Sequence, residues 1–88
     1  MVLGLNAGDA LADGALRNVF LGTDAGGGVT TGQDNIAIGD NALEDATNTA
    51  SFNIAIGSNA LQTCDSSGRN VAIGTNALQA HEIDGNGL

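Results

Sequence analysis

Proline, lysine, tryptophan and tyrosine are absent from the sequence, and phenylalanine, cysteine and histidine are nearly so. The single cysteine, Cys64, cannot form a disulfide within the chain and has no second thiol for a CxxC metal or redox site. Two basic residues stand against ten acidic ones, which gives a net charge of -8. Binding to nucleic acid or to an anionic membrane requires a basic surface. We therefore expect neither partner, and we expect the acidity to keep the protein soluble.

Long apolar runs are also missing. No segment approaches the roughly 18 apolar residues of a membrane-spanning helix, so we expect no membrane insertion. The first residues lack the basic region and apolar stretch of a signal peptide, so we expect no Sec export unless a leader lies outside this sequence. With 88 residues and two Phe as the only aromatic side chains, the chain is at most one domain with a thin core.

The feature that dominates the sequence is an internal repeat. The nonapeptide Asn-Ile/Val-Ala-Ile-Gly-x-Asn-Ala-Leu occurs at 35–43, 53–61 and 70–78, with weaker copies at 18–26 and 2–8. Such a short, regular period predicts a stacked array whose units cannot bury an apolar face alone. We predict one domain, 1–88, with coils near 2–17, 18–34, 35–52, 53–69 and 70–88. The five anchor glycines lie 17 or 18 residues apart: Gly4, Gly22, Gly39, Gly57 and Gly74.

Each nonapeptide has the pattern of a short β-strand that ends at a corner. Ile-Ala-Ile alternates large β-branched and small residues, which favours a strand. A glycine at the same place in every copy indicates a positive φ angle or a close approach of two backbones. We expect Asn-Ala-Leu to form a second, shorter strand. A helix there is disfavoured, because the polar run that follows offers no apolar residues at helical spacing.

The rest of each period is rich in Ser, Thr, Asp, Asn and Gly, which is typical of turns. These stretches, 26–34, 44–52 and 62–69, differ in length by one residue. Length variation indicates an outer arc, and we expect it to be the ligand-facing surface. A helical turn at 10–16 is disfavoured for the same reason, because Gly14 and the register assign it to this arc.

The whole chain is therefore predicted to be all-β, a parallel β-solenoid of about five coils in which like residues stack about 4.8 Å apart. The expected structural core has three columns of stacked apolar residues. A fourth column is expected to be an asparagine ladder, in which stacked side-chain amides hydrogen-bond along the array. The core columns are Ile36, Ile54 and Val71, then Ile38, Ile56 and Ile73, then Leu43, Leu61 and Leu78; the ladder is Asn41, Asn59 and Asn76.

The middle residue of each strand faces the other way, and it is small or apolar in every coil. An outward apolar stripe without a partner is a liability, so we expect it to be the interface of a homotrimer. The alternative is that alanines fill a narrow interior while the isoleucines face partner subunits. Both versions predict a trimer. The residues of the stripe are Phe20, Ala37, Ala55 and Ala72.

Residues suited to catalysis are scarce. The only histidine, His81, lies beside Glu82, and no nucleophile, base and orienting group share one stretch. The acidic residues do not pair at a repeated spacing. We expect no enzymatic activity and no cofactor. Loops rich in Asp, Asn and Gly suit Ca²⁺, so a structural Ca²⁺ is retained as a side hypothesis, although the calcium β-roll and EF-hand spacings are absent.

The repeated motif resembles two related groups over residues 2 to 78. One is the repeat region of bacteriophage tail fibres and spikes, and the other is the β-roll head of trimeric autotransporter adhesins. The resemblance implies a homotrimer of β-solenoids at a surface, used for attachment, and the 17–18-residue period is closer to the phage version. A C-terminal chaperone, an anchor and a membrane β-barrel segment are not visible. We therefore expect a fragment, or a small standalone protein such as a capsid decoration protein or short spike.

Three functional hypotheses follow. The first is a structural or adhesive protein on a virion surface, with other virion structural proteins and a host surface glycan or protein as partners. The second is the head of a bacterial trimeric autotransporter adhesin at the cell surface. The third is a soluble carbohydrate- or ice-binding solenoid, for which Thr23 and Thr75 share a column that Asp40 and Ser58 interrupt.

Overall fold

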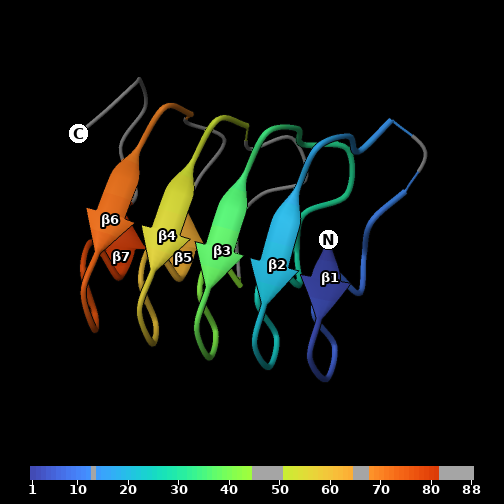
Figure 1. Cartoon of the computed structure of the whole chain (residues 1–88). Coiled ribbons are helices and arrows are strands. Elements are labelled where there is room, and N and C mark those ends of the chain that lie inside the picture. The colour runs from blue at the N-terminus through green and yellow to red at the C-terminus, as the bar shows by residue number, and fades with distance from the viewer. Residues whose placement is uncertain (13, 45–50, 65–67, 82–88) are drawn as a thin grey trace.

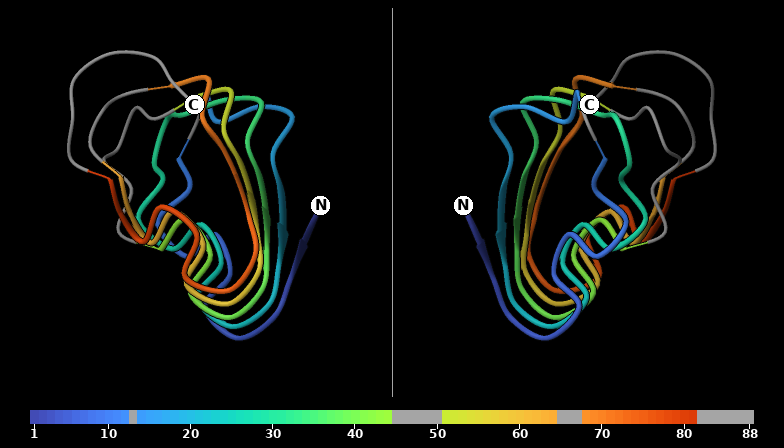
Figure 2. Two further views of the ribbon diagram at one scale, coloured as in Figure 1. Left: turned by 90° about the vertical axis from the view of Figure 1, so that its left-hand side faces the viewer. Right: turned by 90° about the vertical axis from the view of Figure 1, so that its right-hand side faces the viewer.

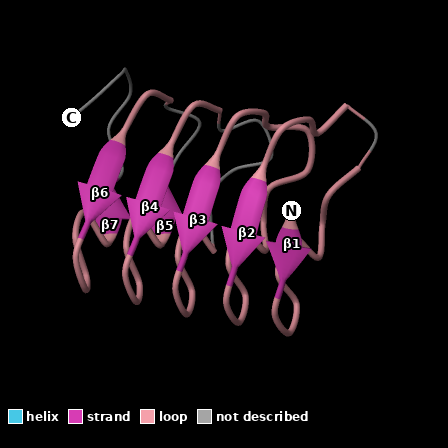
Figure 3. Cartoon of the chain, in the orientation of Figure 1, coloured by secondary structure: helices cyan, strands magenta, loops and turns pink. Residues whose placement is uncertain are grey.

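The computed structural model describes residues 1–12, 14–44, 51–64 and 68–81, and within these residues it contains strands and turns but no helix (Figures 1 and 3). The expected all-β class is therefore confirmed. The strands are β1 (Val2–Leu3), β2 (Val19–Leu21), β3 (Ile36–Ile38), β4 (Ile54–Ile56), β5 (Thr63–Cys64), β6 (Val71–Ile73) and β7 (Ala80–His81).

One strand from each nonapeptide joins a five-stranded parallel sheet in the order β1-β2-β3-β4-β6 (Figure 1). Equivalent residues pair in register, so Ala37 lies between Phe20 and Ala55. A second sheet pairs β5 with β7, also in parallel. Viewed along the stack, the repeats superimpose on one another (Figure 2). The arrangement is consistent with a β-solenoid, and we number its repeats 1 to 5 from the N-terminus.

The corner glycines have the predicted positive φ angles, between 124° and 133°. They also have no room for a side chain. A Cβ atom added at Gly22, Gly39 or Gly57 would lie 2.6–2.8 Å from the backbone of the next corner glycine along the stack. Both reasons for glycine therefore act at the same position, because the turn needs φ > 0 and the neighbouring repeat approaches too closely for a Cβ.

The expected second strand, Asn-Ala-Leu, does not form. Asn41 and Leu43 have φ angles of 62° and 57°, and the Ala42 N–H bonds back to the Gly39 carbonyl at 3.2 Å, so the segment is a pair of tight turns. The turns still bond along the stack. The Gly26 N–H donates to the Ala42 carbonyl at 2.8 Å, and the Leu43 N–H donates to the Ala60 carbonyl at 3.0 Å.

The interior holds the alanines, and the prediction that the isoleucines fill it is wrong. Ala37 and Ala55 are fully buried, whereas Ile73 is 65% exposed. The interior is narrow, because Leu43 and Leu61 are buried in it as well. The alternation of large and small residues along a strand shows that the two faces of the sheet differ, but it does not show which face turns inward. The residues wrongly assigned to the interior are Ile36, Ile38, Ile54, Ile56, Val71 and Ile73, all half-buried or exposed; the third predicted column has Leu43 and Leu61 buried and Leu78 42% exposed.

Repeat 2 shows how tightly the interior is filled. Phe20 replaces the inward alanine and is fully buried, and Gly26 replaces the leucine. A Cβ atom on Gly26 would lie 2.6 Å from atoms of the Phe20 ring. The large side chain therefore enters from one wall in repeat 2 and from the other wall in repeats 3 and 4.

Two asparagine ladders run along the stack. The predicted outer one is present, since the Asn41 Nδ2 donates to the Asn59 Oδ1 at 3.3 Å and the Asn59 Nδ2 donates to the Asn76 Oδ1 at 3.1 Å. The second ladder, which we call the inner ladder, was not predicted. It comprises the buried residues that precede the strands: Asn18, Asn35, Asn53 and Asn70.

In the inner ladder the Oδ1 atoms of Asn18, Asn35 and Asn53 each accept two hydrogen bonds from the next asparagine. The Asn53 backbone N–H and Nδ2 donate to the Asn35 Oδ1 at 3.0 and 3.2 Å. The same pair of bonds joins Asn70 to Asn53, both at 3.0 Å. The Asn18 Nδ2 donates to the Gly32 carbonyl at 2.9 Å. The ladder thus satisfies buried backbone donors at the start of each strand, where hydrophobic residues could not.

Candidate functional site

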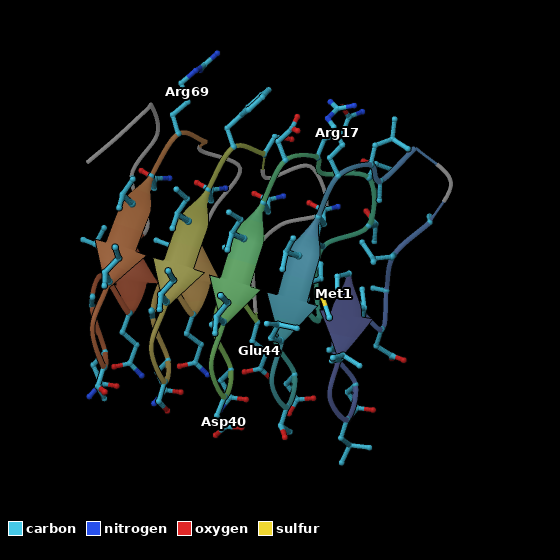
Figure 4. The ribbon with its side chains drawn as sticks, in the orientation of Figure 1. Met1, Arg17, Asp40, Glu44 and Arg69 are labelled. Carbon is cyan, nitrogen blue, oxygen red and sulfur yellow. The ribbon has the colours of Figure 1, made fainter. Side chains whose placement is uncertain are left out.

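The outward side of the five-stranded sheet carries only aliphatic side chains, and we call it the aliphatic face. It has two columns, one from the first and one from the third residue of the strands (Figure 4). The first column is Val19, Ile36, Ile54 and Val71; the second is Leu3, Leu21, Ile38, Ile56 and Ile73.

Stacking covers the middle of the aliphatic face only in part. The residues of β2, β3 and β4 on this face are half-buried, and at its two ends Leu3 and Ile73 are 57% and 65% exposed. Five strands about 4.8 Å apart and three residues of about 3.3 Å each make a patch of roughly 200 Å² in projection. A contiguous apolar patch of a few hundred Å² of accessible surface commonly marks an interaction site.

The residues predicted to form a trimer interface do not reach the surface. Phe20, Ala37 and Ala55 have no exposed surface and Ala72 retains 2%. Their assignment to an interface is wrong, because the chain's own opposite wall covers them. The burial pattern agrees with the alternative, in which alanines fill the interior and isoleucines point outward.

Charged groups are separated along the strand direction. Arg17 and Arg69 lie at the end where strands begin, whereas Asp40 and Glu44 lie around the corners at the other end (Figure 4). The Arg17 Nε and Nη2 donate to the Asp34 carboxylate at 2.6 and 2.9 Å. These hydrogen bonds hold the pKa of Asp34 below its ordinary value and raise the pKa of Arg17.

Arg17 and Asp34 belong to a column that the sequence did not reveal. Its members precede the inner ladder and all have φ angles near 60°. Further along this column the Arg69 guanidinium lies 5.6 Å from the centroid of the Phe52 ring, within cation–π range. The column therefore contains two pairs of side chains that attract each other, an ion pair between Arg17 and Asp34 and a cation–π pair between Arg69 and Phe52.

A pocket of about 290 Å³ lies beside the corners of the first three repeats. In repeat 2 it is lined by Gly27, which occupies the position of Asp9, Glu44 and Gln62 in repeats 1, 3 and 4. Within the described residues, no three His, Cys, Asp or Glu side chains are grouped to hold a metal ion. The structure therefore identifies no calcium site at this pocket. Its lining residues are Asn6, Asp9, Asp24, Gly27, Gly28 and Glu44.

Cys64 and His81, the single cysteine and the single histidine, belong to the two-stranded sheet. The backbones of Cys64 and His81 pair in the small sheet, and Glu82 lies outside the described residues. In the described part of the chain no helix is long and apolar enough to cross a membrane.

Comparisons with protein-family models, with curated proteins and with solved structures found no match for this chain.

Proposed function

We propose that the chain is a non-enzymatic structural and adhesive module that associates through its aliphatic face with two further copies of itself. The observation that carries the proposal is this face: nine aliphatic side chains, half-buried or exposed, on a chain of net charge -8. Lateral association buries the face and keeps the acidic corners in solvent.

The two columns of the face support three-fold symmetry. When three parallel copies surround an axis, the first column of one copy meets the second column of the next, and the heterologous contact closes into a ring. Each copy contributes identical strand spacing, so the stacked residues of neighbouring copies stay in register along the whole contact.

The role at a surface rests on the resemblance to phage fibre repeats and on the polar arcs. We propose a virion-surface fibre, spike or decoration element, whose arcs contact a host glycan or protein. Part of these arcs, 45–50 and 65–67, lies outside the described residues. The alternative is the head of a bacterial trimeric adhesin. It would form the same trimer, but on a bacterial cell instead of a virion. An ice- or carbohydrate-binding monomer is less well supported, because the column of Thr23 and Thr75 includes Asp40.

The test is a charge placed in the centre of the aliphatic face. At protein concentrations too low for any further association, wild type is expected to sediment as a trimer, and Ile56→Arg as a single chain with an unchanged circular dichroism spectrum, because Arg would be desolvated in the contact. Ser58→Arg is the matched control: it adds the same charge to the same repeat but on the corner, and should stay trimeric. A wild-type chain that stays monomeric up to millimolar concentration would refute the proposed association.

A further inference from the structure

Among the backbone hydrogen bonds that join the repeats, three series run through the strand ends and corners of all five repeats. In the first, a corner glycine N–H donates to the third strand residue of the preceding repeat, as Gly74 does to the Ile56 carbonyl at 2.7 Å. In the second, the Asn76 N–H donates to the Ser58 carbonyl at 2.8 Å. In the third, the Leu61 N–H donates forward to the Ala77 carbonyl at 2.8 Å.

Each series starts and stops with complementary groups. At the repeat 5 end, three groups make no backbone hydrogen bond within the described residues: the carbonyls of Ile73 and Thr75 and the N–H of Leu78. At the other end, the N–H groups of Gly4 and Asn6 and the carbonyl of Ala7 come first, and they likewise make none in that part of the chain. The first set therefore presents two acceptors and one donor, and the second presents two donors and one acceptor.

Within the described residues, the edge formed by repeat 5 carries none of the features that usually shield edge strands. Natural edges carry charges, proline or bulges that prevent pairing with another chain. Residues 70–79 contain no charged residue and no proline, and they repeat the nonapeptide that stacks elsewhere in the chain. The Gly74 corner is open as well. A Cβ atom placed there meets only the Ala77 Cβ, at 4.0 Å, whereas one placed at Gly57 collides with the Gly74 backbone.

We propose that the repeat 5 edge binds the repeat 1 edge of a second copy of this chain, head to tail. The Gly4 N–H of the second copy donates to the Ile73 carbonyl, its Asn6 N–H donates to the Thr75 carbonyl, and its Ala7 carbonyl accepts from Leu78. The outer ladder continues across the junction, since Asn76 carries the last Nδ2 of the ladder and Asn6 occupies the equivalent position. The contact repeats the internal stacking step, so it is heterologous and open-ended, and it builds filaments.

Gly74→Ala tests the junction with little disturbance inside the chain. The new methyl group enters open space in one copy, but in the filament it meets the Gly4 corner of the next copy, as it would at the internal corners. Gly14→Ala is the matched control, because Gly14 also has a positive φ, of 96°, and nothing lies within 4 Å of an added Cβ. Both variants carry the backbone strain of a non-glycine residue at positive φ, and only one blocks stacking.

Sedimentation of the 88-residue chain over a hundredfold range of concentration gives the readout. We expect the mean mass of wild type and Gly14→Ala to rise well above that of the lateral trimer over that range, and further in 0.5 M salt, which screens the acidic surfaces. Gly74→Ala should not rise above the mass of the lateral trimer. It should also shorten wild-type filaments when added at one part in ten, because its repeat 1 edge still binds and its blocked edge stops growth.

Lateral and axial association are separated by Ile56→Arg, which is expected to abolish trimers and to leave stacking as single-chain filaments. If wild type shows no growth beyond its lateral assembly, or if Gly74→Ala grows as wild type does, head-to-tail stacking is wrong. Loss of concentration dependence in Gly14→Ala as well would contradict it equally, because the effect would then come from backbone strain. In the Ile56→Arg background, where the lateral contact is blocked, growth and its loss with Gly74→Ala report on stacking alone.

Discussion

At the level of single residues, the interior is governed by one volume constraint that two positions share. In repeats 3 and 4 a small strand residue faces a large one on the opposite wall, as Ala37 and Ala55 do with Leu43 and Leu61. In repeat 2 the sizes are exchanged, with Phe20 on the strand and Gly26 on the opposite wall. All of these residues are buried. A position in this chain therefore cannot be judged apart from the residue on the opposite wall.

This constraint predicts a reciprocal pair of substitutions. Phe20→Ala alone should lower the free energy of unfolding by about 3–5 kcal/mol, because it leaves a cavity. Gly26→Leu alone should destabilise through the clash with the Phe20 ring. The double variant recreates repeats 3 and 4, where leucine at this position has φ angles of 57° and 52°, close to the 63° of Gly26.

Urea unfolding of the four chains measures the coupling. The double variant should recover more than half of the loss seen in Phe20→Ala, which is strong non-additivity. Simple addition of the two single effects would show that Phe20 and the leucine position do not share one space.

Asp34 predicts a specific pH dependence. Its pKa is lowered by the hydrogen bonds from Arg17, so ionised Asp34 stabilises the fold above its ordinary pKa of about 3.8, and this contribution is lost as pH falls through the depressed value. Asp34→Asn should therefore reduce the fall in melting temperature between pH 5 and pH 2. The effect should be small, because the pair is exposed. Asp40→Asn, on a corner away from arginine, is the control, and equal slopes in both variants would contradict the assignment.

At the level of elements, the strands are short because other groups hold the repeats together. Three residues per strand provide few bonds, and the inner ladder adds two further bonds at every step. Because each Asn side chain bonds its counterpart one repeat away, the ladder fixes the register between strands. A shift of one residue would place isoleucine beside the buried amides.

The two ladders make a matched test. Asn53→Ala should cost about 1–3 kcal/mol of unfolding free energy or more, because the buried Asn70 N–H loses its acceptor. Asn59→Gly in the outer ladder removes similar bonds at a partly exposed site, where glycine tolerates the φ angle of 62°, and should cost less than about 1 kcal/mol. Chemical denaturation measures both values. If the two substitutions cost the same, burial of the inner ladder is not what makes it important.

The sequence was sufficient to predict the repeat, the parallel strands and the corner glycines, because each follows from local chemistry. It was not sufficient to orient the strands. Ile36, Ala37 and Ile38 alternate equally well with either face inward, and the size argument favoured the wrong one. The clue to the inward face was repeat 2, where a large Phe20 replaces the alanine and Gly26 replaces the leucine, since this exchange of sizes places both positions in one interior. The inner ladder was visible as a repeated asparagine, but nothing local shows that an amide before a strand is buried.

In the described part of the molecule, strand pairing and the side-chain ladders join each repeat to its neighbours. The strands of the large sheet lie in chain order, β1-β2-β3-β4-β6, and side-chain bonds join residues 17 or 18 positions apart. Stability in such an array is the sum of repeat and neighbour contributions. The same geometry supports the aliphatic face and the two edges, because both are produced by translation of one unit.

Removal of one full unit tests this additivity. Deleting residues 36–53 joins Asn35 to Ile54 and keeps every column in register. The shortened chain should fold with a wild-type circular dichroism spectrum, a lower melting temperature and a smaller dependence of stability on urea, since it buries less surface. Deleting residues 36–44 removes half a unit and should abolish folding. Folding of the second deletion would show that the columns are not required.

The direction of the backbone bonds also determines how the molecule responds to force. The three series lie along the stack, so a pull on the two ends loads every step in series, and the weakest step at an edge opens first. Each opened step frees 17 or 18 residues, which extends the tether by roughly 55–60 Å. An attachment fibre built in this way would lengthen in equal increments under load and re-form when the load is released.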